Sequence, residues 1–350
     1  MKIILDAMGG DNAPEAVVMG ALDAARDFNT EIVLVGKGEE ILAAMKKNGV
    51  NDLPAGVAIA NADDVVDMHD DPAAVLHKRK NSSMVVGLKM LAEGQGDAFV
   101  SAGSTGALLT AATLVVKRVK GIRRAAMAPC LPNKKGGKFM IVDCGANAEC
   151  TPEFLLQFAL IGSLQYKKDN GVANPRVGLL NIGTEDSKGT PLQLEAYKLL
   201  TQAHEQGLIN FIGNVEARQV PLGDVDVVVC DGFSGNILLK SIEGTAMFMG
   251  SMMKNKIFKR KSQLFGGIPA GIGYLLCKPG VDDVMKLLDY REIGGTQFLG
   301  IKKPVIKAHG SSDARAFYNA VRQAVAAANN NTAAELEAAL KQISAAKEKA

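Results

Sequence analysis

Short apolar runs alternate along the chain with longer segments in which apolar residues recur at helical spacing. The runs have the length and composition typical of buried strands, and they span residues 3–5, 31–35, 98–102, 139–144, 177–182 and 225–230. The periodic segments predict helices over residues 14–26, 38–48, 82–93, 107–116, 152–164 and 237–253, with another from residue 192. Strands that alternate with helices in this way predict an α/β fold with a doubly wound, mostly parallel sheet.

No linker-like segment separates two consecutive domains. With 350 residues and 47% hydrophobic content, the chain can bury a large core as one α/β unit or as two lobes. We expect two interleaved lobes, the first formed by residues 1–148 with about 310–330 and the second by residues 149–309. An Ala-rich helical tail is predicted at 331–350, where Thr332 and Glu335 form a capping box.

Glycine and small polar residues gather at five strand-to-helix junctions. These junctions span residues 6–11, 103–106, 145–147, 183–190 and 231–236. In an open α/β sheet, ligands bind beyond the carboxyl ends of the strands, and the amides of a helix's first turn favour an anion. Turn geometry alone accounts for such residues at any single junction. Five junctions that converge on one cleft would suit phosphate or an acyl oxyanion.

The most concentrated junction follows the predicted strand at 177–182. It places two hydroxyls (Thr184, Ser187), two carboxylates (Glu185, Asp186) and the cation of Lys188 between two glycines. A lysine among loop amides and hydroxyls is suited to hold an anion. An ordinary solvated loop is the alternative interpretation, and the residues alone do not decide between them.

A second polar turn, at residues 307–313, combines a lysine, an imidazole and two hydroxyls before a predicted helix. His309 titrates near neutral pH and can act as an acid or base, although a loop histidine more commonly serves as a hydrogen-bonding residue. Cys144 and Cys230 each end a predicted strand. Neither has a basic neighbour in sequence, so we interpret both as inert buried thiols.

Composition and missing motifs narrow the function. The net charge of +3 disfavours a general nucleic-acid binder, and the chain lacks P-loop, dinucleotide-fingerprint and nucleophile-elbow sequences. Its four histidines are scattered, which argues against a histidine-ligated metal. Five cysteines without a CxxC pair, and an N-terminus unlike an export signal, predict reduced cytosolic thiols.

Two segments carry only basic charges. Residues 117–138 form one cluster, and residues 254–278 form another around the uncharged, Gly-rich stretch 264–277. That stretch is too short to span a bilayer, but with its flanking lysines it suits insertion at the headgroup boundary of an anionic membrane. A mobile loop or a dimer contact are the alternatives.

Taken together, the junction motifs resemble the bacterial phosphate acyltransferase family. The matching segments are Asp6-Ala-Met-Gly-Gly-Asp11, Ser101-Ala-Gly-Ser-Thr-Gly-Ala107, Asn181-Ile-Gly-Thr-Glu185 with Lys188-Gly189, Asp231-Gly-Phe-Ser-Gly-Asn236 and Lys307-Ala-His-Gly-Ser-Ser312. They cover nearly the whole chain in the expected order. The resemblance implies two interleaved α/β lobes with a cleft between them, as in phosphotransacetylases and isopropylmalate dehydrogenases, and a homodimer.

The same resemblance implies a reaction and its partners. A fatty acyl group would pass from an acyl-acyl carrier protein thioester to inorganic phosphate, giving acyl phosphate for phospholipid synthesis. The reaction needs no cofactor and no metal. The family is described as cytoplasmic and peripherally associated with the inner face of the cell membrane. A membrane-bound glycerol-3-phosphate acyltransferase is a possible further partner, and the basic clusters would receive the acidic carrier protein.

The resemblance also implies roles for named residues. Lys188 would hold the phosphate or oxyanion charge with Thr184 as a donor, and His309 would protonate the departing thiol. The substrate-binding residues would be Asp11, Gly103, Ser104, Thr105, Asn147, Glu185, Asp231, Ser234, Asn236, Lys307 and Ser311. The membrane-facing residues would be Leu264, Phe265, Ile268, Tyr274, Leu275 and Leu276.

Three other functions compete with this one. An acyl-CoA:phosphate transferase would use the same chemistry with a different thioester. A nicotinamide-dependent dehydrogenase on the same fold is disfavoured by the missing dinucleotide fingerprint. The third is a non-catalytic scaffold that recruits acyl carrier protein to a membrane surface.

Overall fold

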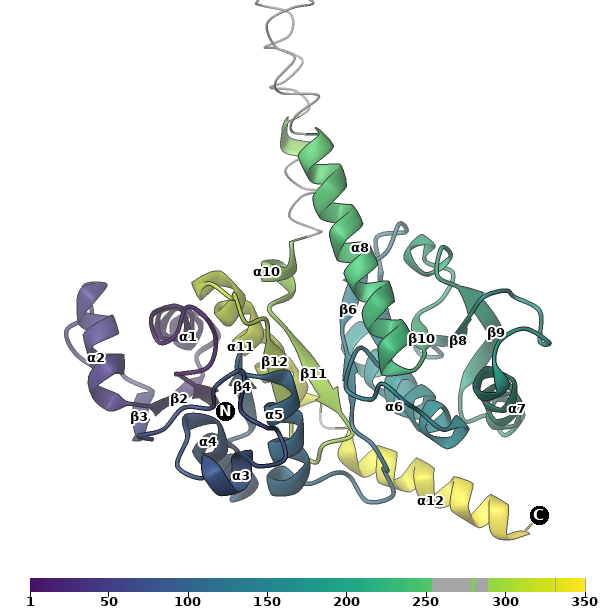
Figure 1. Ribbon diagram of the computed structural model, residues 1–350, viewed down its shortest axis with the longest axis horizontal. Coiled ribbons are helices and arrows are strands. Elements are labelled where there is room, and N and C mark those ends of the chain that lie inside the picture. The colour runs from purple at the N-terminus through teal and green to yellow at the C-terminus, as the bar shows by residue number, and fades with distance from the viewer. Residues whose placement is uncertain (254–277, 281–288, 331, 350) are drawn as a thin grey trace, which may run out of the picture.

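The computed structural model describes residues 1–253, 278–280, 289–330 and 332–349, in two sheets that lie side by side (Figure 1). A seven-stranded sheet has the order β3-β2-β1-β4-β12-β11-β5, and a five-stranded sheet has the order β6-β7-β10-β8-β9. Helices cover both faces of the first sheet, and most neighbouring strands are parallel. The predicted doubly wound α/β fold with two lobes is therefore confirmed.

The first sheet has a parallel centre and an antiparallel edge. Its parallel strands are β1 (Lys2–Asp6), β2 (Glu31–Gly36), β3 (Val57–Asn61), β4 (Ala98–Ser101) and β12 (Val305–Ala308). The strands β11 (Gly295–Leu299) and β5 (Ala126–Ala128) complete it in antiparallel pairing. Its central strands are buried on both faces, which explains why they appear in the sequence as continuous apolar runs.

Successive residues of these strands enter two different cores. Ile3 and Leu5 pack with α1 (Glu15–Phe28), α2 (Gly38–Lys47) and α11 (Ala314–Asn329). Ile4 faces the other side, toward α4 (Ser83–Ala92), α5 (Thr105–Ala111) and the π-helix Ala112–Val116. A four-residue helix, α3 (Val75–Lys78), also lies on that side.

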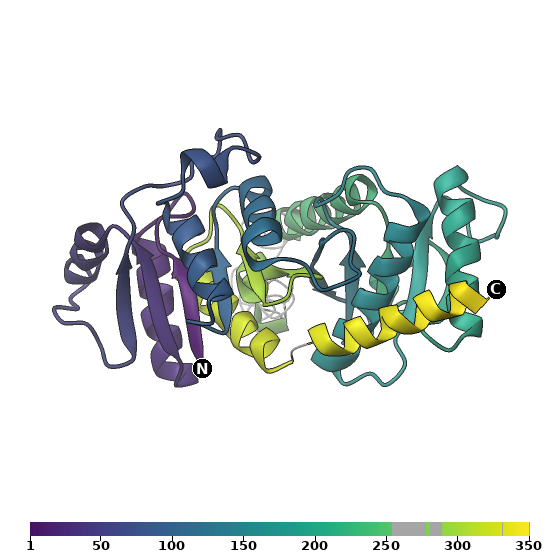
Figure 2. The ribbon, with the colours of Figure 1, turned by 90° about the horizontal axis from the view of Figure 1, so that it is seen from below.

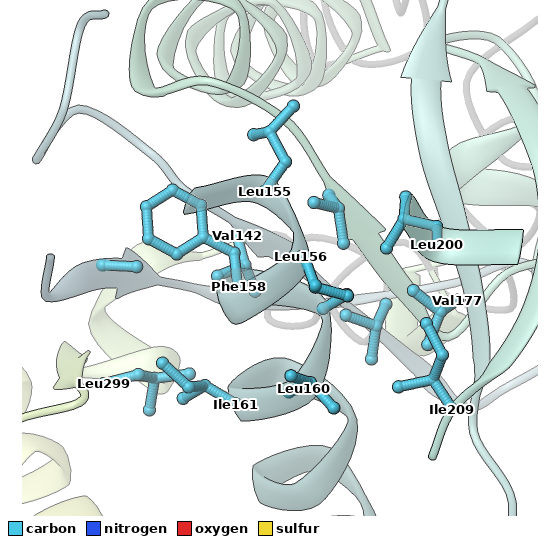
Figure 3. Close-up of a cluster of buried hydrophobic side chains, with 14 of the residues drawn as sticks. Val142, Leu155, Leu156, Phe158, Leu160, Ile161, Val177, Leu200, Ile209 and Leu299 are labelled. Carbon is cyan, nitrogen blue, oxygen red and sulfur yellow. The ribbon is translucent and has the colours of Figure 1, made fainter. Parts of the chain in front are cut away.

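The second sheet contains β6 (Cys130–Pro132), β7 (Lys138–Val142), β8 (Arg176–Asn181), β9 (Asn210–Glu216) and β10 (Val227–Val229). It packs on α6 (Pro152–Asn170) and α7 (Pro191–Glu205), with the 3₁₀ turn Val220–Leu222 beyond β9 and α8 (Gly232–Met253) after β10. Figure 3 shows Phe158, Leu160 and Ile161 of α6 in this core. Leu299 of β11 lies in the same cluster, so the two sheets share buried apolar contacts.

The sequence predicted β1, β2, β4, β7, β8 and β10 as apolar runs, but it missed β3, β5, β6, β9, β11 and β12. Most of the missed strands are short or contain polar residues, as in the Gly-Thr-Gln-Phe-Leu sequence of β11. Residues 307 and 308 belong to β12 and not to a turn as expected. A strand of four residues that contains a lysine gives no periodic signal, so the sequence did not reveal β12.

Sheet membership crosses the predicted lobe boundaries. Residues 138–142, expected in the first lobe, pair with β10 of the five-stranded sheet. Residues 295–308, expected in the second lobe, pair with β4 and β5 of the seven-stranded sheet. The chain changes sheets at Pro129, between two strands of three residues each, and so short a crossing leaves no linker signature.

The predicted C-terminal helix is present as α12 (Ala333–Lys349) and is docked on the second lobe (Figure 2). Leu336 and Leu340 are buried against α6, and the Lys168 ammonium lies 2.7 Å from the Glu335 carboxylate. No helix in the described ranges is both long and apolar enough to cross a membrane. The six predicted membrane-facing residues between 264 and 276 lie outside the described residues.

We predict that Gly235→Ala destabilises the protein, because the backbone of α8 approaches β7 too closely for a side chain. A Cβ at position 235 would lie 1.9 Å from the carbonyl oxygen of Asp143. Forced overpacking of this kind costs about 1–3 kcal/mol in the free energy of unfolding, measurable by urea titration.

Gly244→Ala is the matched control on the same helix, because nothing lies within 4 Å of a Cβ there. It should be neutral or stabilise by up to about 1 kcal/mol, the ordinary benefit of alanine over glycine in a helix. Equal effects of the two substitutions would contradict the close approach.

Candidate active site

The polar loops that follow β1, β4 and β12 meet at the carboxyl ends of these strands, which are parallel neighbours. The Asp11 amide donates to the Gly310 carbonyl at 2.8 Å, and the Asn12 side chain donates to the Ser311 carbonyl at 3.2 Å. Gly10 has φ +103°, and a Cβ there would lie 3.0 Å from the Gly310 oxygen. The close approach of the first loop to the last therefore requires glycine at position 10.

The Asp6 carboxylate lies beneath these loops and is only 2% exposed. It accepts hydrogen bonds from the Ser83 hydroxyl at 2.5 Å and the Ser101 hydroxyl at 2.7 Å. Ser101 in turn accepts from the Gly103 amide at 3.0 Å, which fixes the start of the turn before α5. Burial raises the pKa of Asp6, although the two serine hydroxyls act in the opposite direction.

Lys307 is the next-to-last residue of β12, at the same edge of the sheet. Its ammonium donates to the carbonyls of Ala102, at 3.4 Å, and of Ala308. Desolvation lowers the pKa of Lys307 to about 8, while the charges of Asp6 and Asp11 act to raise it. Lys307 is thus a mostly buried cation that still carries its proton at neutral pH.

His309 follows Lys307 at an exposed position. Its Nδ1 lies 2.9 Å from the Ser311 hydroxyl and accepts from the Ser311 amide at 3.3 Å. Desolvation and the nearby cations Lys240 and Lys307 lower its pKa, so the imidazole is mostly neutral at pH 7. Because Nδ1 accepts a backbone N–H, the neutral ring carries its proton on Nε2.

A cavity of about 440 Å³ opens between these loops and α8. Five of the predicted site residues line it, namely Asp11, Thr105, Lys307, His309 and Ser311. The facing wall is formed by Leu239, Lys240 and Glu243 of α8, and Met127, Pro129 and Leu131 form the wall at the crossing between the sheets. The volume lies within the range of small-molecule sites, about 300–1,000 Å³.

A second polar cluster, which includes the predicted residue Asn147, surrounds the buried Asp143 carboxylate after β7. Asp143 accepts from the Asn147 amide at 2.6 Å, from the Asn147 side chain at 2.9 Å and from the Met127 amide at 2.8 Å. The Gly232 amide donates to the Asn147 carbonyl at 2.7 Å, which joins this turn to the start of α8. Met127 also lines the cavity, so the Asp143 turn supports one of the cavity's walls.

Three further predicted residues lie at the start of α8. Asp231 is buried and accepts from the amide and hydroxyl of Ser234, both at 2.8 Å. Asp231 and Ser234 therefore cap the helix in this structure. Asn236 is exposed on the same turn, next to Gly145.

The junction expected to be the centre of the site lies elsewhere. Thr184, Glu185 and Lys188 are exposed and are not among the residues that line the cavity. The Lys188 carbonyl accepts from Asn181 at 3.0 Å, and the Glu185 carbonyl accepts from Asn214 of β9 at 2.7 Å. These contacts hold the loop against β9 at the edge of the second sheet, and the catalytic roles of Lys188 and Thr184 stay predictions.

Several residues at or beneath the cavity were missed as site residues. Asp6, Ser83 and Asp143 are buried supports, while Lys240, Glu243 and Thr296 line the cavity. Asp6 and Asp143 each end a strand shortly before a glycine, a signal that the sequence contained. Lys240 and Glu243 lie in a helix interior, where nothing in the sequence indicates proximity to the Lys307 loop.

Within the described residues, neither a cysteine nucleophile nor a metal site is supported. Burial raises the pKa of the Cys144 and Cys230 thiols well above the ordinary value, which fits the interpretation that neither is a nucleophile. Within the same residues, no three His, Cys, Asp or Glu side chains gather as a metal site would require.

Sequence comparison identifies the family. The family model described as fatty acid synthesis protein matches residues 1–335. A phosphate acyltransferase of Clostridium acetobutylicum is 45% identical over 331 residues, covering 94% of this chain and 96% of the relative. That of Bacillus licheniformis is 43% identical over 343 residues, covering 98% and 99%. The chain belongs to the phosphate acyltransferase family.

Solved structures agree in fold. A phosphotransacetylase from Streptococcus pyogenes has a TM-score of 0.62 at 20% identity, covering 94% of each chain. A branched-chain phosphotransacylase from Enterococcus faecalis has a TM-score of 0.57 at 14% identity, covering 94% of this chain and 99% of the other. A putative 4-hydroxythreonine-4-phosphate dehydrogenase from Salmonella typhimurium has a TM-score of 0.51.

Membership of the phosphate acyltransferase family decides the class of reaction. The protein is an acyltransferase of fatty acid and lipid synthesis, with an acyl compound and phosphate as its substrates. The dehydrogenase and the non-catalytic scaffold are correspondingly disfavoured. A cavity that presents Lys307 to an anion fits a family that uses phosphate.

We predict that phosphate affinity falls as the pH rises through about 8, because Lys307 then loses the proton that gives it charge. In Asp6→Asn the fall should begin at lower pH, since the lost carboxylate no longer favours the ammonium. Isothermal titration with inorganic phosphate between pH 6.5 and 9.5 measures the shift.

Asp11→Asn is the control for this effect. Asp11 also acts on Lys307 but is exposed, so water screens its charge and the shift should be smaller. An affinity that stays constant to pH 9.5 in the wild type would show that Lys307 does not hold the anion.

Proposed function

We propose that this acyltransferase moves a fatty acyl group from the thioester of acyl carrier protein to inorganic phosphate. A phosphate oxygen attacks the acyl carbon, the carbon–sulfur bond breaks, and the products are acyl phosphate and the free carrier thiol. The observation that carries the proposal is the cavity in which Lys307, Thr105 and His309 converge within a phosphate acyltransferase fold.

The chemistry asks mainly for positioning and charge. Inorganic phosphate is substantially dianionic at pH 7 and is already a nucleophile. The protein must hold it in line with the thioester and stabilise the oxyanion that forms at the acyl oxygen. Lys307 supplies a desolvated positive charge for this purpose, and a preorganised donor of this kind is worth about 3 kcal/mol in the transition state.

The pKa directions favour Lys307 over His309 as the proton source for the leaving thiolate. A thiol ionises near pH 8.5, which is close to the value of about 8 for Lys307. The His309 imidazole is already mostly neutral at pH 7, so it is a poor acid before substrate binds. We therefore assign His309 a hydrogen-bonding role toward the substrate, in place of the predicted protonation step.

Exposed basic and apolar residues support the proposed contacts with the carrier protein and the membrane. Lys120, Arg123, Lys134 and Lys138 of the first basic cluster are exposed, and positive charge of this kind would steer an acidic carrier. At the outer end of α8, Met247 and Phe248 are 74% and 61% exposed (Figure 1). This exposed apolar helix end, which precedes residue 254 in the sequence, supports contact with an anionic membrane at its cytoplasmic face. We further propose that the protein acts there as a homodimer, near the membrane-bound glycerol-3-phosphate acyltransferase.

We predict that the purified protein forms acyl phosphate from hexadecanoyl-acyl carrier protein and phosphate. A strong preference for hexadecanoyl-CoA in kcat/KM would instead support the acyl-CoA:phosphate alternative. Lys307→Ala should lower kcat/KM by about 100-fold or more, the usual cost of one oxyanion donor.

Two further lysine variants show whether a loss of activity in Lys307→Ala is specific to that lysine. Lys198→Ala changes an exposed lysine on α7 and should leave turnover unchanged. Lys188→Ala tests the predicted role of the 183–190 loop. A loss in Lys188→Ala with full activity in Lys307→Ala would place the anion on that loop and overturn our assignment.

We also predict that Leu264→Asp combined with Phe265→Asp abolishes sedimentation with anionic liposomes, because charged groups resist burial among lipid chains. Soluble turnover should be preserved. Liposomes of neutral lipid control for non-specific pelleting. Undiminished sedimentation of the variant would refute a membrane role for this segment.

A further inference from the structure

A second cavity, of about 570 Å³, lies on the opposite side of β11 from the candidate active site. Part of its lining is apolar and comes from Ala128, Met140, Leu299, Ile306, Ala326 and Ala327, while the buried Gln165, with Asp169 and Gln297, adds polar groups. These residues come from both sheets and from α11, so the cavity belongs to the interface between the lobes. Polar side chains such as Lys138 and Arg322 stand at exposed positions around it.

The two cavities share part of their lining. Ile293, Gly295 and Thr296 contribute to both. Thr296 pairs across β11 and β12 with Lys307, so these two side chains share the face toward the candidate active site. Gln297 pairs with Ile306, and both line the second cavity. The start of β11 is therefore the common wall.

The strands between the two cavities separate at the start of β11. β11 pairs with β5 as far as Gln297 and Ala128, and a continued register would bring Gly295 opposite Cys130. Cys130 instead pairs with Met140 of β7, so the two strands diverge. Leu131 then lines the first cavity while Cys130 lines the second. Gly294 and Gly295 pack closely on α11 and β12 here, since a Cβ would lie 2.4 Å from the Ala320 amide nitrogen at position 294 and 2.6 Å from Ile306 at position 295.

We propose that the second cavity receives the hydrocarbon tail of the fatty acyl thioester, whose carbonyl is held beside Lys307, and that the chain passes between β6 and the start of β11, where the two strands diverge. The inference rests on the proposed function. It gives a long acyl chain apolar side chains to contact next to a polar reaction centre, and each buried methylene strengthens binding roughly fourfold.

Ala326 offers a test that leaves the core intact. It lies on α11 at an exposed position and lines the second cavity, so Ala326→Trp should fill that cavity without disturbing the buried face of the helix. Asn329→Trp places the same bulk at another exposed position of α11 that does not line the cavity. Thermal unfolding confirms that both variants are folded.

The readout is kcat/KM with hexadecanoyl- and hexanoyl-acyl carrier protein. For Ala326→Trp we expect at least a tenfold loss with the long chain, because displacing two methylenes already costs more than that. The value for the short chain and the KM for phosphate should stay within twofold of the wild type. Asn329→Trp should match the wild type with both donors.

The outcomes separate this inference from the proposed function. Equal losses for both donors, or no loss for either, would overturn the tail site while leaving acyl transfer intact. If the wild type forms no acyl phosphate at all, the proposed function fails. Calorimetric binding of hexadecanoate to wild type and Ala326→Trp then decides the tail site, and undiminished binding by the variant would overturn it.

Discussion

The candidate active site depends on one buried carboxylate. Asp6 has almost no contact with water, and an ionised group in such a place must be compensated by hydrogen bonds. Ser83 and Ser101 supply two of them, and they belong to α4 and β4, elements distant from β1 in sequence. The need to satisfy Asp6 therefore fixes three elements relative to one another, and the loops that form the cavity begin from those elements.

The same carboxylate governs the charge next to it. Lys307 would lose its proton more readily if desolvation acted alone, and Asp6 with Asp11 opposes that loss. A cation can thus stand at the end of a buried strand and remain charged at neutral pH. The second lobe repeats the principle, since the buried Asp143 holds Asn147 and Met127 in place through their amides. Each lobe forms one wall of the cavity. Asp6 supports the wall from the first lobe, and Asp143 supports the wall from the second.

The sequence was sufficient for the architecture because long strands buried on both faces appear as apolar runs. It was insufficient for β11 and β12, which are short, contain Thr296 and Lys307, and derive their stability from the sheet around them. The positions of β11 and β12 also determine which of the predicted site residues line the same cavity. Glycine-rich junctions at 6–11 and 103–106 could be expected near one edge, since they follow predicted parallel strands. The 307–313 turn could not, because its strand β12 was not predicted. The 183–190 loop is held by Asn214 of β9, a strand that the sequence did not reveal.

The arrangement of charges explains why an anion suits this cavity. Lys307 and Lys240 line it from opposite lobes, and Asp11 and Glu243 stand beside them, so the described walls are close to neutral overall. A cavity of that kind does not attract anions over long distances, and selectivity must come from short-range contacts. A desolvated ammonium provides such a contact because it gains most from an anion that restores the interactions lost with water. Lys307 is therefore poised for a phosphate oxygen or a developing oxyanion, while the neutral imidazole of His309 can lie beside that charge without competing for it.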